Sequence, residues 1–268
     1  DLTYVSNAVA EGNSFADTYF QFTADITLPV GWTPIGSASK RFSGHINGAK
    51  QDGGNYLLTI PAGEKTMLGC TVEASLKNLD IYGERINGAG VVDLYTTGKP
   101  AKTQITIEHV TLKSGSKTKY SGFVGGYSHG NAPIFIYDCT IEKGVTIGDD
   151  GSWGDMSGTV KYPFGPPVTV QENDMIASFG GAFNGVIRNC VSDANVYGHS
   201  YIGGIVAFKG QSMGECIVEN CEFGGSIVAT GSYVGGIVGS GYHSNSAPNT
   251  PCLSVQNCLF RGTVSAAD

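Results

Sequence analysis

An internal repeat dominates the C-terminal half of the chain. Residues 187–208 read IRNCVSDANVYGHSYIGGIVAF, residues 217–238 read IVENCEFGGSIVATGSYVGGIV, and residues 254–264, SVQNCLFRGTV, begin a third copy. Each copy places Asn-Cys two residues after an apolar residue, and the two full copies continue to a Tyr-apolar-Gly-Gly segment. Repeats of this length indicate stacked supersecondary units, so the repeat constrains the fold more than any other feature.

Weaker copies in the N-terminal half extend the repeat into two columns of equivalent positions. The spacing within both columns is about 30 residues, with one insertion after Cys139. The apolar runs between turns are short and rich in Val, Ile and Tyr, which favours strands and excludes helical repeats. We therefore predict an all-β fold, a parallel β-helix of about 30 residues per coil. The columns are Leu79, Val110, Cys139, Cys190, Cys221 and Cys258 for the small apolar position, and Gly90, Gly126, Gly181, Gly204 and Gly236 for the glycine position.

The apolar column predicts a buried ladder in which cysteines stack between coils as reduced thiols. The chain has seven cysteines, an odd number, so they cannot all pair within one chain. A disulfide between Cys216 and Cys252 stays open as an alternative. The preceding column carries short polar side chains that can hydrogen-bond between coils or hold a turn. Its members are Asn78, His109, Asp138, Asn189, Asn220 and Asn257.

Composition excludes several classes of protein. The 268 residues include 40 glycines, only 15% are charged, and the net charge is −7. Low charge with 41% hydrophobic residues argues against disorder. The glycines follow no Gly-X-Y period, which excludes collagen, and no apolar run is long enough for a transmembrane helix. The acidic balance disfavours nucleic-acid binding.

The N-terminal part is expected to close the stack. Residues 1–45 are assigned to a cap, with a weakly helical start, and to a first strand, because a solenoid must cover its first coil. Residues 46–268 are assigned to the coils, interrupted by an insertion at about 143–178. We expect one domain. The last copy stops before its Gly-Gly segment, which suggests a fragment of a longer protein.

Several segments resemble bacterial surface proteins with GLUG-type repeats. They are Ala24–Leu28, Gly31–Gly36 and Phe42–Gly48, followed by YIGGIV at 201–206 and YVGGIVG at 233–239. The resemblance implies a right-handed parallel β-helix displayed outside the cell, often within a longer adhesin. Some relatives carry such repeats beside protease or carbohydrate-active domains. The first coils here lack the full Gly-Gly motif, and the repeat does not account for the insertion.

The insertion is the main candidate for ligand binding. Asp149, Asp150 and Asp155 lie within seven residues and offer oxygen ligands for Ca²⁺, although their spacing is not that of an EF-hand. Trp153, Tyr162 and Phe164 could present aromatic faces to a sugar. The alternative is a loop that covers the flank of a coil and buries its own aromatic rings.

No catalytic residues are assigned. Four acids near the columns form no convincing cluster in the sequence, and the histidines other than His109 have neighbours typical of exposed turns. The acids are Asp80, Asp93, Asp138 and Glu219, and the histidines are His45, His109, His129, His199 and His243.

The favoured function is a non-catalytic, extracellular module of a bacterial surface protein, a stalk or adhesion surface. Its expected partners are a glycan or protein of the host or environment and further domains of the same polypeptide, with no nucleic acid and no membrane insertion. The alternatives are a carbohydrate-active enzyme of the β-helix type, which requires two neighbouring carboxylates, or a glycan-binding module.

Overall fold

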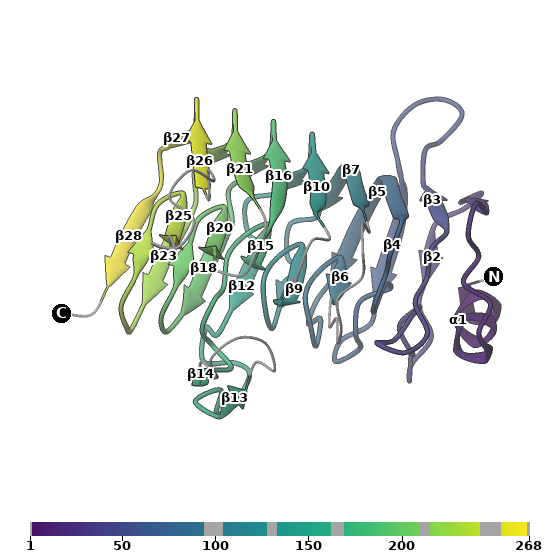
Figure 1. Ribbon diagram of the computed structural model, residues 1–268, viewed down its shortest axis with the longest axis horizontal. Helices are drawn as coiled ribbons and strands as arrows, with labels where there is room; N and C mark the ends of the chain where they lie inside the picture. Colours follow the sequence, from purple (N-terminus) through teal and green to yellow (C-terminus); the bar gives the residue numbers. More distant parts are fainter. Residues whose placement is uncertain are drawn as a thin grey trace.

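The computed structural model describes residues 2–93, 104–127, 133–161, 169–209, 215–241 and 253–266. Strands make up 45% of the structure and helix 5%, so the predicted all-β class is confirmed. The helix α1 (Leu2–Glu11) lies at one end of an elongated stack of strands (Figure 1). No helix in the described ranges is long and apolar enough to cross a membrane.

Three parallel sheets curl around a common core and account for most strands. Two smaller sheets join β13 (Thr159–Lys161) to β14 (Thr169–Gln171), antiparallel, and β19 (Ile202–Gly203) to β24 (Val234–Gly235), parallel. The first parallel sheet contains β1 (Tyr19–Gln21), β2 (Ile26–Thr27), β3 (His45–Asn47), β4 (Tyr56–Ile60), β5 (Ala74–Gly83), β7 (Ile105–Leu112), β10 (Ile134–Tyr137), β11 (Thr140–Ile141), β16 (Gly185–Arg188), β17 (Val191–Ser192), β21 (Cys216–Glu219), β22 (Glu222–Phe223), β26 (Leu253–Gln256) and β27 (Leu259–Phe260). The second contains β8 (Lys117–Thr118), β12 (Thr146–Gly148), β18 (Asn195–Gly198), β23 (Ser226–Ala229) and β28 (Thr263–Ala266). The third contains β6 (Val92–Asp93), β9 (Val124–Tyr127), β15 (Gly180–Ala182), β20 (Val206–Lys209) and β25 (Val238–Gly241).

The strand register follows the sequence repeat. Leu79 pairs with Val110, as the apolar column predicts, and Ile187 pairs with Val218, which pairs in turn with Val255. Buried and half-buried side chains alternate along strands such as β10 and β18, and a large continuous cluster of buried residues fills the interior. The pairing of repeats about 30 residues apart therefore places equivalent side chains above one another.

The glycine column differs from the prediction at two positions. Gly90 donates its N–H to the carbonyl of Gly122, and Gly122 donates to Ala177, so Gly122 and Ser178 stand where Gly126 and Gly181 were expected. A Cβ atom on Gly122 would lie 2.5 Å from the carbonyl oxygen of Ser178. Close approach of backbones therefore requires glycine at 122, whereas Gly126 lies within β9.

The extra segment after Cys139 is shorter than expected. β12 pairs with β8 and β18, so residues 146–148 belong to the second sheet. The chain leaves the stack after Gly148, forms the β13–β14 hairpin on the flank (Figure 1), and pairs again at Ala177 with Gly203.

Candidate functional site

The polar column forms a bend within the first sheet. All six of its residues have a left-handed backbone, with φ between 51° and 56°. Asn, Asp and His adopt this conformation more readily than most residues, which explains the residue types found here. In β5 the bend at Asn78 interrupts the alternation of buried and exposed side chains; in later repeats it separates β10 from β11 and β16 from β17.

Side-chain amides link the bends of neighbouring repeats. The Nδ2 of Asn78 donates to Oδ1 of Asn47 at 2.8 Å, and Asn220 donates to Asn189 at 3.2 Å. Asn189 in turn donates to Oδ1 of Asp138 at 3.1 Å. The predicted hydrogen bonding at this column is therefore confirmed at the Asp138–Asn189 and Asn189–Asn220 steps, whereas Asn78 bonds to Asn47, outside the column.

The cysteine column is buried and reduced. The six described cysteines all carry free thiols, including Cys216, so the alternative of a Cys216 disulfide is not realised; Cys252 lies outside the described residues. Cys139, Cys190 and Cys221 are buried and Cys258 is half-buried. Burial raises the pKa of Cys190 far above its ordinary value. These thiols are packing groups with little nucleophilic character.

The predicted aromatic site is described only at Trp153. Its indole N–H donates to the carbonyl of Gly148 at 3.0 Å, and the guanidinium of Arg85 lies 4.7 Å from the ring centre. Arg85 also donates to the carbonyl of Ser152 at 2.7 Å. Trp153 thus bonds within its own loop, half-buried, with Arg85 over its ring. Tyr162 and Phe164 lie outside the described residues.

The three aspartates of the loop are engaged separately. Asp149 accepts the N–H of Gly151, Asp155 accepts the N–H and hydroxyl of Ser157, and Asp150 contacts Lys117 at 3.0 Å. Burial alone would raise the pKa of Asp150, but hydrogen bonds from Ser152 and Lys117 lower it below the ordinary value. Within the described ranges these carboxylates form no three-ligand cluster, so the geometry gives no support to a Ca²⁺ site built from them.

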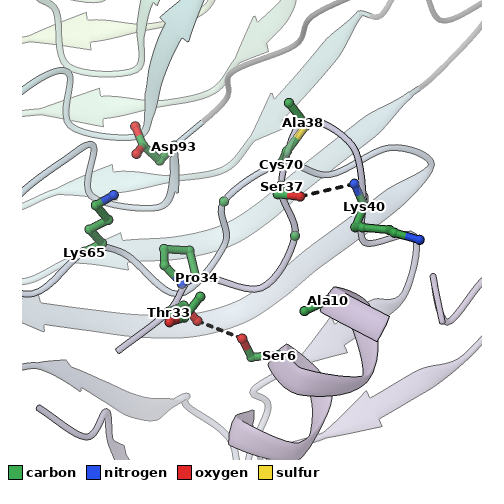
Figure 2. A pocket seen from close by; sticks show the side chains of 12 residues that line it. Ser6, Ala10, Thr33, Pro34, Ser37, Ala38, Lys40, Lys65, Cys70 and Asp93 are labelled. Carbon is green, nitrogen blue, oxygen red and sulfur yellow. Dashed lines mark hydrogen bonds between the residues drawn. The ribbon is translucent and has the colours of Figure 1, made fainter. Parts of the chain in front are cut away.

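A pocket of about 300 Å³ lies between α1 and the turn that follows Trp32 (Figure 2). Ser6 of α1 donates its hydroxyl to the carbonyl of Thr33 and ties the helix to this turn. Lys65, Cys70 and Asp93 form the opposite wall. Burial raises the pKa of Asp93, and Lys65 opposes that shift in part. Cys70 is buried, and burial raises the pKa of its thiol. The pocket thus contains the carboxyl group of Asp93, whose charge Lys65 balances only in part, and the thiol of Cys70.

A second polar site lies on the outer face of β7 and β10. Glu108, His109 and Asp138 bring one ligand atom each to within 4.8 Å of one another, the one such group of three in the described part of the chain. Glu108 Oε1 lies 3.8 Å from His109 Nδ1, and Asp138 Oδ2 lies 4.0 Å from His109 Nε2. Lys77 pairs with the other oxygen of Glu108 at 2.6 Å. This site can hold a cation or polarise a polar ligand.

The sequence contained a signal for this cluster. His109 and Asp138 occupy successive positions of the polar column, so stacking of the repeats brings them together. The sequence alone did not indicate Glu108. Its place in the cluster depends on β7 presenting the side chain outward, beside Lys77 of β5. The group includes Asp138 and none of the other three acids considered in the sequence, Asp80, Asp93 and Glu219.

The remaining histidines have separate environments. His45 shares a hydrogen bond with Ser75 at 2.9 Å, and His199 contacts the nearly buried Asp174 at 2.8 Å. His129 and His243 lie outside the described residues.

Comparisons with protein-family models, with curated proteins and with solved structures find no match to this chain.

Proposed function

We propose that the chain is a non-catalytic, extracellular module of a bacterial surface protein, built on a right-handed parallel β-helix with GLUG-type repeats. The observation that carries this proposal is the parallel pairing of strands from successive repeats without a shift in register. β16, β21 and β26 pair in this way in one sheet, and β18, β23 and β28 do so in another. Equivalent residues pair over successive repeats, which suits an elongated scaffold (Figure 1).

The bends and the interior support a scaffold role. The amide links at the bends and the buried cysteine column repeat the same contact between neighbouring strands. Each repeat buries its apolar face only against its neighbours, so the stack forms a stiff rod. Such a rod can carry other domains away from a cell or present its outer face to a glycan or protein partner.

Two experiments test this function. Protease treatment of intact source cells, followed by detection with an antibody against this chain, should remove the antigen while leaving a cytosolic marker protein intact. Affinity electrophoresis in gels containing host, plant or microbial polysaccharides should retard the protein if it is an adhesion surface. Antigen that resists the protease until the cells are lysed would contradict the surface location.

The carboxylate pair favours one competing function, a carbohydrate-active enzyme. Glu108 and Asp138 lie closer together than about 5 Å, the separation typical of retaining glycosidases. An enzyme would release reducing ends or unsaturated sugars from a polysaccharide, and both Glu108→Gln and Asp138→Asn would abolish the release. A non-catalytic module releases none.

A further inference from the structure

The amide ladder at the bends is interrupted at His109. Asparagine or aspartate occupies the other five positions of the column, and two of its steps, Asp138–Asn189 and Asn189–Asn220, carry side-chain hydrogen bonds. The imidazole of His109 lies between Asn78 and Asp138 in the column, 54% exposed. Its contacts with the neighbouring carboxylates, at 3.8 and 4.0 Å, are too long for hydrogen bonds. The ring therefore faces two acceptors without bonding to either.

In each carboxylate, one oxygen is anchored by a neighbouring side chain and the other approaches the imidazole. Glu108 is anchored through Oε2 by Lys77, and Asp138 is anchored through Oδ1 by Asn189. Their second oxygens, Oε1 and Oδ2, are the atoms that approach the imidazole. The anchored oxygens keep the carboxylates in place, and the second oxygens are directed at a common region beside the ring.

We propose that Glu108, His109 and Asp138 bind a divalent transition-metal ion of the Zn²⁺ class, which links β7 to the bend after β10. An imidazole with two carboxylates suits such ions, whereas Ca²⁺ takes oxygen ligands alone. In a tetrahedral site with metal–ligand bonds of about 2.1 Å, ligand atoms lie about 3.4 Å apart. The three ligand atoms here lie within 4.8 Å, and rotation of these partly exposed side chains closes the difference. Water completes the coordination on the solvent side.

Lys77 is the group that competes with the metal. Its ammonium group lies 2.6 Å from Glu108 and neutralises part of the charge that attracts a cation. Removal of this ammonium group should therefore strengthen metal binding, which a purely structural role of the cluster does not predict.

The test is isothermal titration of ZnCl₂ into the chain, without a histidine tag, in a buffer that does not chelate metals. The wild-type protein should bind one ion at this site. His109→Asn should weaken that binding at least about tenfold, and Asp138→Asn should do the same, while Lys77→Gln should strengthen it. Both weakening variants are matched to the fold, because asparagine occupies Asn78, Asn189 and Asn220 in the same left-handed conformation. Their metal-free melting temperatures should equal that of the wild type.

Three results would overturn the proposal. They are the absence of a saturable event at one equivalent, unchanged affinity in His109→Asn, and weaker binding by Lys77→Gln. If Zn²⁺ bound at other histidines or at thiols instead, the wild type and the three variants would bind it with equal affinity, and that result would contradict this site. The titration requires no enzymatic or adhesive activity, so its outcome is independent of the proposed function.

Discussion

Asp93 ends β6 on the wall of the pocket beside α1, where burial raises the pKa of its carboxyl group and Lys65 offsets only part of that shift. A folded-state pKa above the unfolded value means that the native protein binds this proton more tightly. Stability is therefore lost as pH rises from the ordinary value of 3.8 through the raised value, and it stays lower at neutral pH.

Asp93→Asn should consequently stabilise the protein at pH 7. The change removes the buried charge and keeps the shape of the side chain, so we expect a rise in Tm of about 2–4 °C, the effect of about 1 kcal/mol in a chain of this size. Calorimetry from pH 3 to pH 8 should show that the gain vanishes below the ordinary carboxyl pKa. Asp52→Asn, in an exposed loop, serves as the control and should change little. Equal gains at acidic and neutral pH would show that the charge of Asp93 is not the cause.

The cysteine column predicts a pattern of thiol reactivity. Cys190 and Cys221 are buried, and their pKa values lie far above the ordinary value; for Cys221 the hydrogen bond with Cys190 contributes most and burial next. Cys258 is half-buried, and burial raises its pKa as well. Iodoacetamide labelling followed by peptide mass spectrometry should modify Cys258 first among the ladder thiols. Cys190 and Cys221 should react only after denaturation, and rapid labelling of Cys190 in the native protein would contradict the stacked ladder.

At the scale of the element, the left-handed bend between strands is the recurrent unit. Asn220 connects β21 to β22 with φ 53° and donates to Asn189. Alanine there loses the hydrogen bond and also meets the left-handed backbone cost of about 1–2 kcal/mol. Glycine loses the hydrogen bond without the steric cost.

We therefore expect Asn220→Ala to lower the free energy of unfolding by about 2 kcal/mol and Asn220→Gly by about 1 kcal/mol. Urea denaturation of the two variants and the wild type measures both differences. The ranking of the two variants is the decisive result. If alanine lowered the free energy of unfolding less than glycine did, backbone strain at the bend would not determine the residue type. Asn220→Asp keeps the backbone conformation but cannot donate to Asn189, so its loss should be about as large as that of Asn220→Gly.

The same elements show what the sequence could predict. The apolar and polar columns were readable because Asn-Cys recurs at equivalent positions, and Leu79 indeed pairs with Val110. The glycine column could not be assigned correctly from the sequence, because Gly122 and Gly126 are the same residue type and fit the pattern equally well. The choice depends on which glycine faces a carbonyl of the adjacent repeat, and in the structure Gly122 does.

The candidate site was predictable only in part, for a related reason. The column brings His109 and Asp138 together, but the outward direction of Glu108 and the anchoring by Lys77 depend on pairing between β5 and β7. In the loop, the sequence predicts a ligand platform at Trp153, and the contact of its ring with Arg85, 68 residues earlier, could not be predicted. Contacts between distant segments decide such cases.

At the scale of the whole molecule, the two described ends of the stack differ. α1 covers one end and buries Val5 and Val9 against it (Figure 1). At the other end β28 pairs with β23 on one side, and Val264 is 44% exposed although its partner Ile227 is fully buried. Phe260 stacks on the buried Phe223 at 5.9 Å and is itself 37% exposed. Within the described residues, this end therefore presents apolar side chains beside the edge strand β28.

An edge of this kind should cause self-association of the chain at high concentration. Val264→Lys places a charge among the apolar side chains at the edge and should lower the association constant, because a lysine on an edge opposes strand-to-strand pairing. Ser265→Lys adds the same charge on the same strand, but on the face paired with the exposed Val228, and should have the smaller effect. Sedimentation velocity over a range of concentrations compares the three proteins, with circular dichroism to verify that each is folded. A wild-type chain that remains monomeric throughout, or two lysine variants that behave alike, would show that this apolar edge does not drive association.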